Sequence, residues 1–141
     1  MEKIQDQIPQ TLFEAMNYSV KNGGKRLRPI LLLETAKQEK EATNEAVALA
    51  CALELIHTYS LVHDDLPAMD NDDLRRGKPT NHIVFGEDLA ILAGDGLLNY
   101  AYEIMLEEGV ATGNAGYRKA MATIAKAAGS KGMVGGQADD I

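Results

Sequence analysis

The chain has 141 residues, about the size of one domain, and 45% of them are apolar, which is enough for a hydrophobic core. Its formal net charge of −7 argues against a nucleic-acid partner. No run of ~18 uninterrupted apolar residues suggests a membrane span, and no charged segment followed by an apolar run opens the chain as a secretion signal would. We therefore expect a cytoplasmic protein.

The apolar pattern indicates helices throughout. Valine, isoleucine and aromatic residues never alternate with polar residues as they do in a strand, so the sequence predicts an all-α fold. The single cysteine, Cys51, falls within an apolar helical pattern, where a lone cysteine is most often a small core residue and seldom a nucleophile. We expect it to be buried.

The first helix is predicted to begin near Pro9, because residues 1–8 carry no clear pattern and proline suits the first turn of a helix. Leu12 and Met16 then repeat at helical spacing. Glycines within residues 22–24 end this helix, since glycine adopts the left-handed conformation of a helix cap at little cost.

A second helix is predicted from Ile30 to about Gln38, with Pro29 at its start. Residues 30–33 are all apolar, so the helix has no polar side there and we expect it to be buried. The charged run at 37–41 is predicted to be solvated.

A third helix, capped by Thr43 or Asn44, is predicted from Glu45 to about Asp65. Few of its positions are charged, which predicts that it lies at the centre of the fold. Pro67 ends it, because the residue before a proline disfavours the helical conformation.

Beyond the loop that follows, residues 81–85 are predicted to form one helical turn that a glycine closes. A long helix is predicted over 87–107, interrupted by glycines within 94–96, and another over 114–128. The tail at 129–141 is compatible with a continuation of that last helix, and its small residues allow close helix approach.

The segment 64–79 carries an unusual concentration of charge, with five aspartates within ten residues and two arginines directly after them. Packed carboxylates repel each other unless a positive group lies between them, and a hard divalent cation is the partner that binds carboxylate oxygens best. The end of a helix adds the negative pole of its dipole. Because the chain must bend at Pro67, Asp70 is able to return toward Asp64 and share a cation with it.

Basic residues flank this acidic segment. Arg75 and Arg76 suit an anion such as phosphate, although taken alone they are ordinary surface charges. The glycine loop and bases at 23–28 precede a helix, which also suits a phosphate, but the pattern of a P-loop is absent. His57, which taken alone reads as a core histidine, lies on the same helix face as Asp64, ~10 Å along the axis. Two separate basic sites beside a metal site predict that the protein binds two phosphorylated groups close to each other.

Three motifs carry a resemblance to a known family: Gly-Gly-Lys-Arg-Leu-Arg-Pro at 23–29, the run from His57 to Asp70, and Asp-Asp-Leu-Arg-Arg-Gly-Lys-Pro-Thr at 72–80. They resemble the trans-isoprenyl diphosphate synthases (polyprenyl synthetases), and among them the bacterial farnesyl diphosphate synthases. The likeness continues through residues 135–140.

The resemblance implies an all-α isoprenoid synthase bundle around a central cavity, with residues 1–141 as the N-terminal part of a single domain. It implies a homodimer and a Mg²⁺-dependent, head-to-tail condensation of isopentenyl diphosphate with an allylic diphosphate, dimethylallyl or geranyl. Farnesyl diphosphate and diphosphate would be the products. Metal ions and arginines would stabilise the departing diphosphate, and a dry cavity would protect the allylic cation from water.

The resemblance also implies roles for individual residues. The metal ligands would be Asp64, Asp70 and Asp140, with Asp65 in support. Isopentenyl diphosphate would be held by Lys25, Arg28, His57 and Arg76. The allylic diphosphate would be held by Arg75, with Gln137 near the allylic carbon.

Product length is predicted from Tyr59 and Ser60, which lie five and four residues before Asp64. Together with the two extra residues in the aspartate motif, they resemble the bacterial farnesyl diphosphate synthases, in which the Tyr59 ring would be the floor that stops chain growth. The alternative is that Tyr59 is a plain core residue.

The chain departs from the family because the second aspartate-rich motif, the lysine–threonine region before it and the basic C-terminal residues are absent. We therefore expect that residues 1–141 alone do not turn over substrate and that exposed apolar faces promote association.

Two other functions remain open. One is a geranylgeranyl or longer-chain synthase, which Tyr59 disfavours. The other is a non-catalytic helical subunit or cation-binding module, which the intact aspartate and arginine pairs disfavour.

Overall fold

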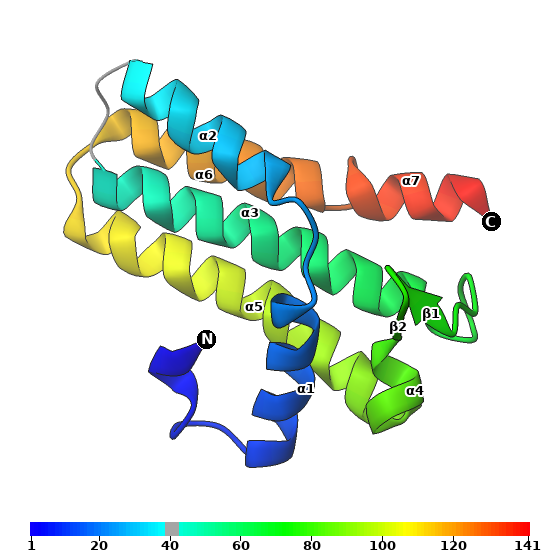
Figure 1. The fold of residues 1–141 in the computed structure, drawn as a ribbon. Helices are drawn as coiled ribbons and strands as arrows, with labels where there is room; N and C mark the ends of the chain where they lie inside the picture. The colour runs from blue at the N-terminus through cyan, green and yellow to red at the C-terminus, as the bar shows by residue number, and fades with distance from the viewer. Residues whose placement is uncertain (39–42) are drawn as a thin grey trace.

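A computed structural model describes residues 1–38 and 43–141 and has the predicted all-α architecture (Figure 1). In chain order its elements are the 3-10 helix η1 (Glu2–Ile4), α1 (Gln10–Lys21), α2 (Leu27–Gln38), α3 (Thr43–Asp64), β1 (Leu74–Arg75), β2 (Lys78–Pro79), α4 (Asn81–Phe85), α5 (Glu87–Ala111), α6 (Ala115–Ala128) and α7 (Met133–Asp140).

Helix α3 lies at the centre of the bundle, as predicted. It packs along α5, and α2, α6 and α1 also contact it (Figure 1). By length and composition alone its stretch Asn44–Asp64 is apolar enough to cross a membrane, and half of the 18-residue apolar part of this stretch is buried inside the protein. Its place between α2 and α5 explains this composition, because a helix covered on several sides must be apolar on several sides.

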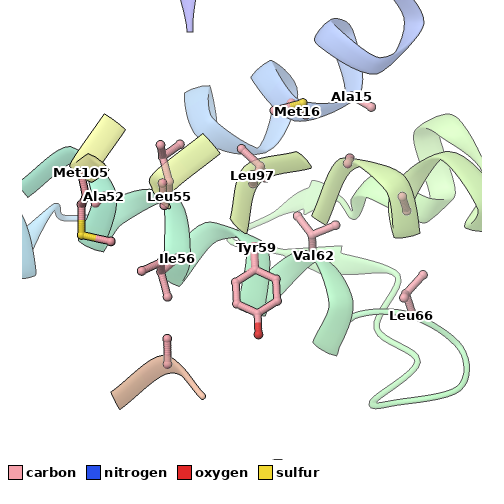
Figure 2. Close-up of a cluster of buried hydrophobic side chains, with 14 residues drawn as sticks. Ala15, Met16, Ala52, Leu55, Ile56, Tyr59, Val62, Leu66, Leu97 and Met105 are labelled. Carbon is pink, nitrogen blue, oxygen red and sulfur yellow. The ribbon is translucent and has the colours of Figure 1, made fainter. Parts of the chain in front are cut away.

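The core forms where α3 and α5 face each other, with α1 closing one side (Figure 2). Leu97 and Met105 of α5 are at most 1% exposed, and Leu55 and Ile56 of α3 pack in the same cluster. Burying each such side chain stabilises the fold by roughly 1.5–3 kcal/mol. Tyr59 belongs to this cluster too, between Ile56 and the residues Val62 and Leu66 at the end nearer the acidic segment.

The predicted break in the long helix at residues 94–96 is wrong, since α5 is continuous from Glu87 to Ala111. The glycines there serve helix packing instead. A Cβ on Gly94 would overlap the His63 ring, and a Cβ on Gly96 would lie 2.9 Å from Met16 Sδ. Each glycine lets a neighbouring side chain approach the α5 backbone closely, a role that the sequence alone does not distinguish from a helix break.

Two burial predictions are also wrong. In α2, Ile30 and Leu31 are 49% and 57% exposed, because α2 packs against α3 on one side and its other side is open. Cys51 is exposed as well, since it lines an open groove between α3 and α5 beside Tyr100 and Ile104. An apolar helical pattern shows which residues could pack, but not how far the neighbouring helices extend over them.

Most element boundaries agree with the sequence. Asn22 caps α1, and α4 ends at Gly86. Asn114 caps α6 by accepting hydrogen bonds from the backbone N–H groups of residues 116 and 117.

Other boundaries differ. Helix α2 begins three residues before its predicted start, and α3 begins at Thr43, two residues early. The tail does not continue α6, because a turn at 129–132 separates it from α7. Residues 39–41 of the predicted solvated run lie outside the described residues.

A two-stranded hairpin within 74–79 was not predicted. Leu74 pairs with Pro79 and Arg75 with Lys78 in antiparallel register. The two residues between the strands have positive φ angles, 52° at Arg76 and 78° at Gly77. A two-residue turn with both φ angles positive matches the right-handed twist of the strands it joins. Two-residue strands are too short to leave an alternating pattern in the sequence.

Candidate functional site

The acidic segment folds back onto the end of α3. The N–H of Asp70 donates to the carbonyl of Asp64 at 2.8 Å, and the N–H of Asp72 donates to the carbonyl of Asp65 at 3.1 Å. These bonds satisfy carbonyls that the helix end leaves without partners. The bend predicted at Pro67 therefore exists, and the backbone of Asp70 returns to that of Asp64.

The consecutive aspartates at this helix end have different surroundings. Asp65 is 3% exposed and accepts two hydrogen bonds from Arg75, Nε to Oδ2 at 2.9 Å and Nη2 to Oδ1 at 2.7 Å. Asp64 is half-buried, and its Oδ1 accepts a hydrogen bond from Nε2 of Gln137 on α7. Both Asp65 oxygens are thus taken by an arginine, whereas Asp64 remains available to a cation on one oxygen.

Negative charge accumulates around Asp70, whose own side chain is exposed. The nearby Asp64 carboxylate is the main cause that raises the pKa of Asp70, followed by partial desolvation and by the charges of Asp72 and Asp140. Helix α7 therefore brings Asp140 within electrostatic reach of the acidic segment. In the described part of the chain, no three carboxylate, histidine or cysteine side chains converge closely enough to form a finished metal site. Oxygen donors that repel one another in this way fit a hard divalent cation, which removes the repulsion.

A pocket on the other side of the α3 end has many polar and charged residues in its lining; we call it the basic pocket. It includes His57, Asp65, Arg75, Arg76 and Lys78 together with glycines 23 and 24. The loop before α2 closes it, since a Cβ on Gly24 would lie 2.7 Å from Arg76 Nη2.

The pKa of His57 is lowered by its surroundings in this pocket. Burial is the main cause that lowers the pKa of His57, followed by the charge of Arg28; Arg76 and Arg75 add to the effect, and Glu54 opposes it. Beside burial, three arginines thus place positive charge near His57. An anionic ligand would offset this charge.

Left-handed backbone conformations gather in the loops of this site. The non-glycine residues with positive φ in the described residues are Arg26 at 57°, Asn71 at 55° and Arg76 at 52°. Such conformations are uncommon outside glycine and cluster where a fold must hold side chains for function. Arg26 lies in the basic loop, residues 23–26 before α2, and Asn71 and Arg76 lie within 64–79; the sequence analysis singled out both stretches.

Arg26 fastens the basic loop. Its guanidinium pairs with Glu54 on α3 and donates to the carbonyl of Val20 at the end of α1. Lys25 and Arg28 on either side are exposed and do not line the basic pocket. The sequence predicted Lys25 and Arg28 as anion ligands but not Arg26 as the residue that holds their loop.

On the opposite face of α3, a cavity of about 670 Å³ lies between α3, α5 and α7. We call it the Tyr59 cavity. Its lining includes Tyr59, Ser60, His63, Asp64, Ile91, Met133 and Gln137. Burial is the main cause that raises the pKa of the Tyr59 hydroxyl. Ser60 Oγ donates to the carbonyl of His57 at 2.6 Å, so its hydroxyl is bonded to the helix itself.

The structure therefore brings together most of the predicted site residues around one helix end. Asp64, Gln137, Tyr59 and Ser60 line the Tyr59 cavity, and His57, Arg75 and Arg76 line the basic pocket.

The sequence analysis missed Lys78 and His63. Lys78 donates to Asn22 Oδ1 at 3.0 Å in the basic pocket. His63 lines the Tyr59 cavity. The sequence marks these two residues only by position, because Lys78 follows the arginine pair and His63 precedes Asp64. A single basic residue at such a position is common and does not by itself indicate a function.

Several known proteins are similar to this chain in sequence. The profile of the family described as Polyprenyl synthetase matches residues 9–141. A farnesyl diphosphate synthase of Geobacillus stearothermophilus is 55% identical over 134 residues, which cover 94% of this chain and 45% of that enzyme. A chloroplastic geranylgeranyl pyrophosphate synthase of Capsicum annuum is 50% identical over 133 residues, which cover 94% of this chain and 36% of the other.

Solved structures share the fold. A geranyltransferase from Legionella pneumophila matches with a TM-score of 0.90 at 41% identity, covering 99% of this chain and 50% of that one. The apo structure of an FPP/GFPP synthase from Zymomonas mobilis matches with a TM-score of 0.88 at 44% identity, covering 99% and 52%. This chain thus spans about half, or less, of the length of these relatives.

Proposed function

This chain belongs to the polyprenyl synthetase family, and from that premise we propose that it forms the N-terminal part of a prenyl diphosphate synthase domain. The proposed reaction joins isopentenyl diphosphate to dimethylallyl or geranyl diphosphate and yields farnesyl diphosphate and diphosphate. The named relatives include farnesyl and geranylgeranyl synthases, which supports this substrate class.

One observation carries the proposal. The end of α3 separates a basic pocket, lined by His57 and Arg76, from a cavity lined by Tyr59 and Asp64. A condensation of two diphosphates needs two anion sites and one apolar channel within reach of each other. The α3 end offers this arrangement, because successive residues of a helix point to different sides of its axis.

The chain's residues have defined tasks in this proposal. His57 and Arg76 in the basic pocket hold isopentenyl diphosphate, together with two exposed residues outside the pocket lining, Lys25 from the loop before α2 and Arg28 from the first turn of α2. Arg75, oriented by Asp65, approaches the allylic diphosphate with its remaining N–H groups. Such a preorganised fork gives charge-assisted hydrogen bonds to phosphate oxygens.

Asp64 and Asp70, with Asp140 from α7, would hold Mg²⁺, and the repulsion that raises the pKa of Asp70 supports this assignment. When bound, the ions neutralise charge that develops on the departing diphosphate. Asp65 would act indirectly by orienting Arg75 rather than as a ligand.

The covalent change involves both substrates. The carbon–oxygen bond of the allylic diphosphate breaks and its electron pair leaves with the diphosphate. The double bond of isopentenyl diphosphate forms the new carbon–carbon bond, and a proton is then lost. Apolar side chains of the Tyr59 cavity exclude water that would otherwise capture the allylic cation. Gln137 would lie near the allylic carbon.

Product length is proposed to end at farnesyl because the Tyr59 ring, with Ser60 beside it, closes the cavity below Asp64. Tyr59 is 8% exposed, which supports a fixed floor. A geranylgeranyl synthase is the second candidate, favoured by the 50% identity to the Capsicum enzyme.

We also propose a homodimer in the cytoplasm. Because this chain spans about half of its relatives' length, we expect residues 1–141 to bind diphosphates without turning them over.

A product assay tests the function. The full-length gene product, incubated with Mg²⁺, isopentenyl diphosphate and geranyl diphosphate, is expected to form farnesyl diphosphate. Asp70→Asn should abolish this, whereas Asp73→Asn, a matched charge removal in the same segment, should not. Binding of Mg²⁺ without prenyl product would instead support a non-catalytic cation-binding module. Rapid farnesyl production by residues 1–141 alone would contradict the expectation that the active site is completed elsewhere.

A further inference from the structure

His63 links the proposed floor residue to the neighbouring helix. Its ring packs against Tyr59, with ring centroids 5.5 Å apart and planes at 78°, an edge-to-face arrangement that aromatic rings favour. On its other side, His63 Nε2 lies 2.9 Å from the carbonyl oxygen of Ile91 in α5. Because a carbonyl only accepts hydrogen bonds, Nε2 carries the hydrogen and donates it.

Gly94 makes room for this contact. A Cβ at this position would overlap Nε2 and both ring carbons next to it, so His63 occupies space that any larger residue at 94 would fill. Gly94 is buried within a continuous helix, where glycine is less favourable than alanine by helix propensity. The notch in α5 therefore has a definite occupant, the imidazole of His63.

These contacts lie at the cavity that would receive the growing chain. Tyr59, His63 and Ile91 line the Tyr59 cavity together, and Asp64 follows His63 directly in α3. Figure 2 shows the Tyr59 ring leaving α3 on the side away from Leu97, with its hydroxyl farthest from that side chain. The ring belongs to the core cluster and is 8% exposed, and His63 meets it edge-to-face beside the cavity.

We infer that His63, seated in the Gly94 notch, is a positioning residue that holds the Tyr59 ring across the cavity and so determines product length. This inference rests on the proposed function. The link runs from the α5 backbone through the imidazole to the phenol ring. Breaking it at either end should free the ring to swing away from this position and deepen the space available to the prenyl chain.

The test compares products of the full-length gene product and its variants. His63→Ala removes the imidazole, and Gly94→Ala expels it without changing residue 63. In both we expect the ratio of geranylgeranyl to farnesyl product to rise about tenfold, the scale expected for loss of one aromatic contact. Gly96→Ala is the matched control, because it adds the same methyl group to the same helix but meets the flexible Met16. Its product ratio should stay unchanged.

Two further variants separate positioning from a general loss of structure. In a Tyr59→Ala background, His63→Ala should change the product ratio no further, since His63 acts through the Tyr59 ring. His63→Gln keeps an N–H donor for the Ile91 carbonyl but has no ring, so it should still lengthen the product. If His63→Ala fails to fold, the product ratio of His63→Gln serves as the test instead.

The outcomes distinguish the inference from the function on which it rests. A wild-type protein that makes no prenyl diphosphate overturns both. A wild type that makes farnesyl diphosphate, with His63→Gln and Gly94→Ala doing the same, overturns only the inference. An equal product shift in Gly96→Ala would also overturn it, because the effect would then belong to the helix and not to the His63 notch.

Discussion

Arg75 and Asp65 form a two-fold hydrogen-bonded ion pair in which the carboxylate is almost wholly buried, its side chain 4% exposed, and the guanidinium is 32% exposed. The pair joins the hairpin strand β1 to the end of α3. It fixes the base of the acidic segment before any ligand binds.

Asp65→Asn is expected to lower the free energy of unfolding by about 2 kcal/mol, because it leaves the partly buried Arg75 charge without its partner. A urea titration followed by circular dichroism measures this. Asp73→Asn removes a charge from an exposed residue of the same segment and should change stability by less than ~0.5 kcal/mol. Equal urea midpoints of unfolding for both variants would mean that the Arg75–Asp65 pair contributes nothing to stability.

Asp70→Asn is expected to have opposite effects with and without Mg²⁺. Its neighbours raise the pKa of Asp70 above the ordinary 3.8, so the protonated form favours folding. That contribution is complete below the ordinary value and is lost as pH rises through the raised one. In chelator at pH 7 the variant should therefore melt at or above the wild-type temperature.

In excess Mg²⁺ the wild type should melt higher than Asp70→Asn, and calorimetry should show Mg²⁺ affinity weakened at least ~10-fold in the variant. Asp139→Asn, next to Asp140 but without an assigned role, is the control. A variant with unchanged Mg²⁺ affinity would remove Asp70 from the proposed ligand set.

His57 is expected to titrate below its ordinary pKa of 6.5, because burial and then the Arg28 charge disfavour the imidazolium. A depressed pKa means that stability is lost as pH falls from the ordinary value through the lowered one. Inorganic pyrophosphate should raise the pKa of His57 and bind more tightly as pH falls. NMR titration of the imidazole signals measures both effects.

Arg28→Gln should move the His57 titration back toward its ordinary pKa. Arg118→Gln, on the distant helix α6, should leave the titration where it is in the wild type. If neither Arg28→Gln nor pyrophosphate changes the pKa of His57, the result would argue against an anion site shared by His57 and Arg28.

Tyr59→Ala is expected to shift product from farnesyl toward geranylgeranyl diphosphate in the full-length gene product, because it removes the proposed floor. Loss of a buried aromatic ring should also cost about 3 kcal/mol of stability. Tyr59→Phe keeps the ring and should keep the product. If chromatography of the Tyr59→Ala products still shows only farnesyl diphosphate, the ring is plain core and the floor hypothesis is wrong.

Local sequence determined most of the helices and the content of the site. Proline before α1 and the Asn114 cap act within a few residues, so their effects are visible in the chain itself. The glycines after α1 do not act as predicted, because Asn22 is the cap residue and Gly23 and Gly24 are not among the glycines with positive φ. The charge of the acidic segment and of the arginines that follow it is equally local. The prediction of a bend returning Asp70 toward Asp64 succeeded because a proline must interrupt the helix there.

Tertiary structure decided what each residue faces. Consecutive aspartates received different surroundings because Arg75 reaches one and Gln137 the other. Glycines 94 and 96 read as breaks in the sequence, yet they are sites of close packing in one unbroken helix. Such contacts join residues far apart in the chain. Helical periodicity gives the direction of a side chain, but only the packed neighbour decides whether that direction holds a core, a cavity or solvent.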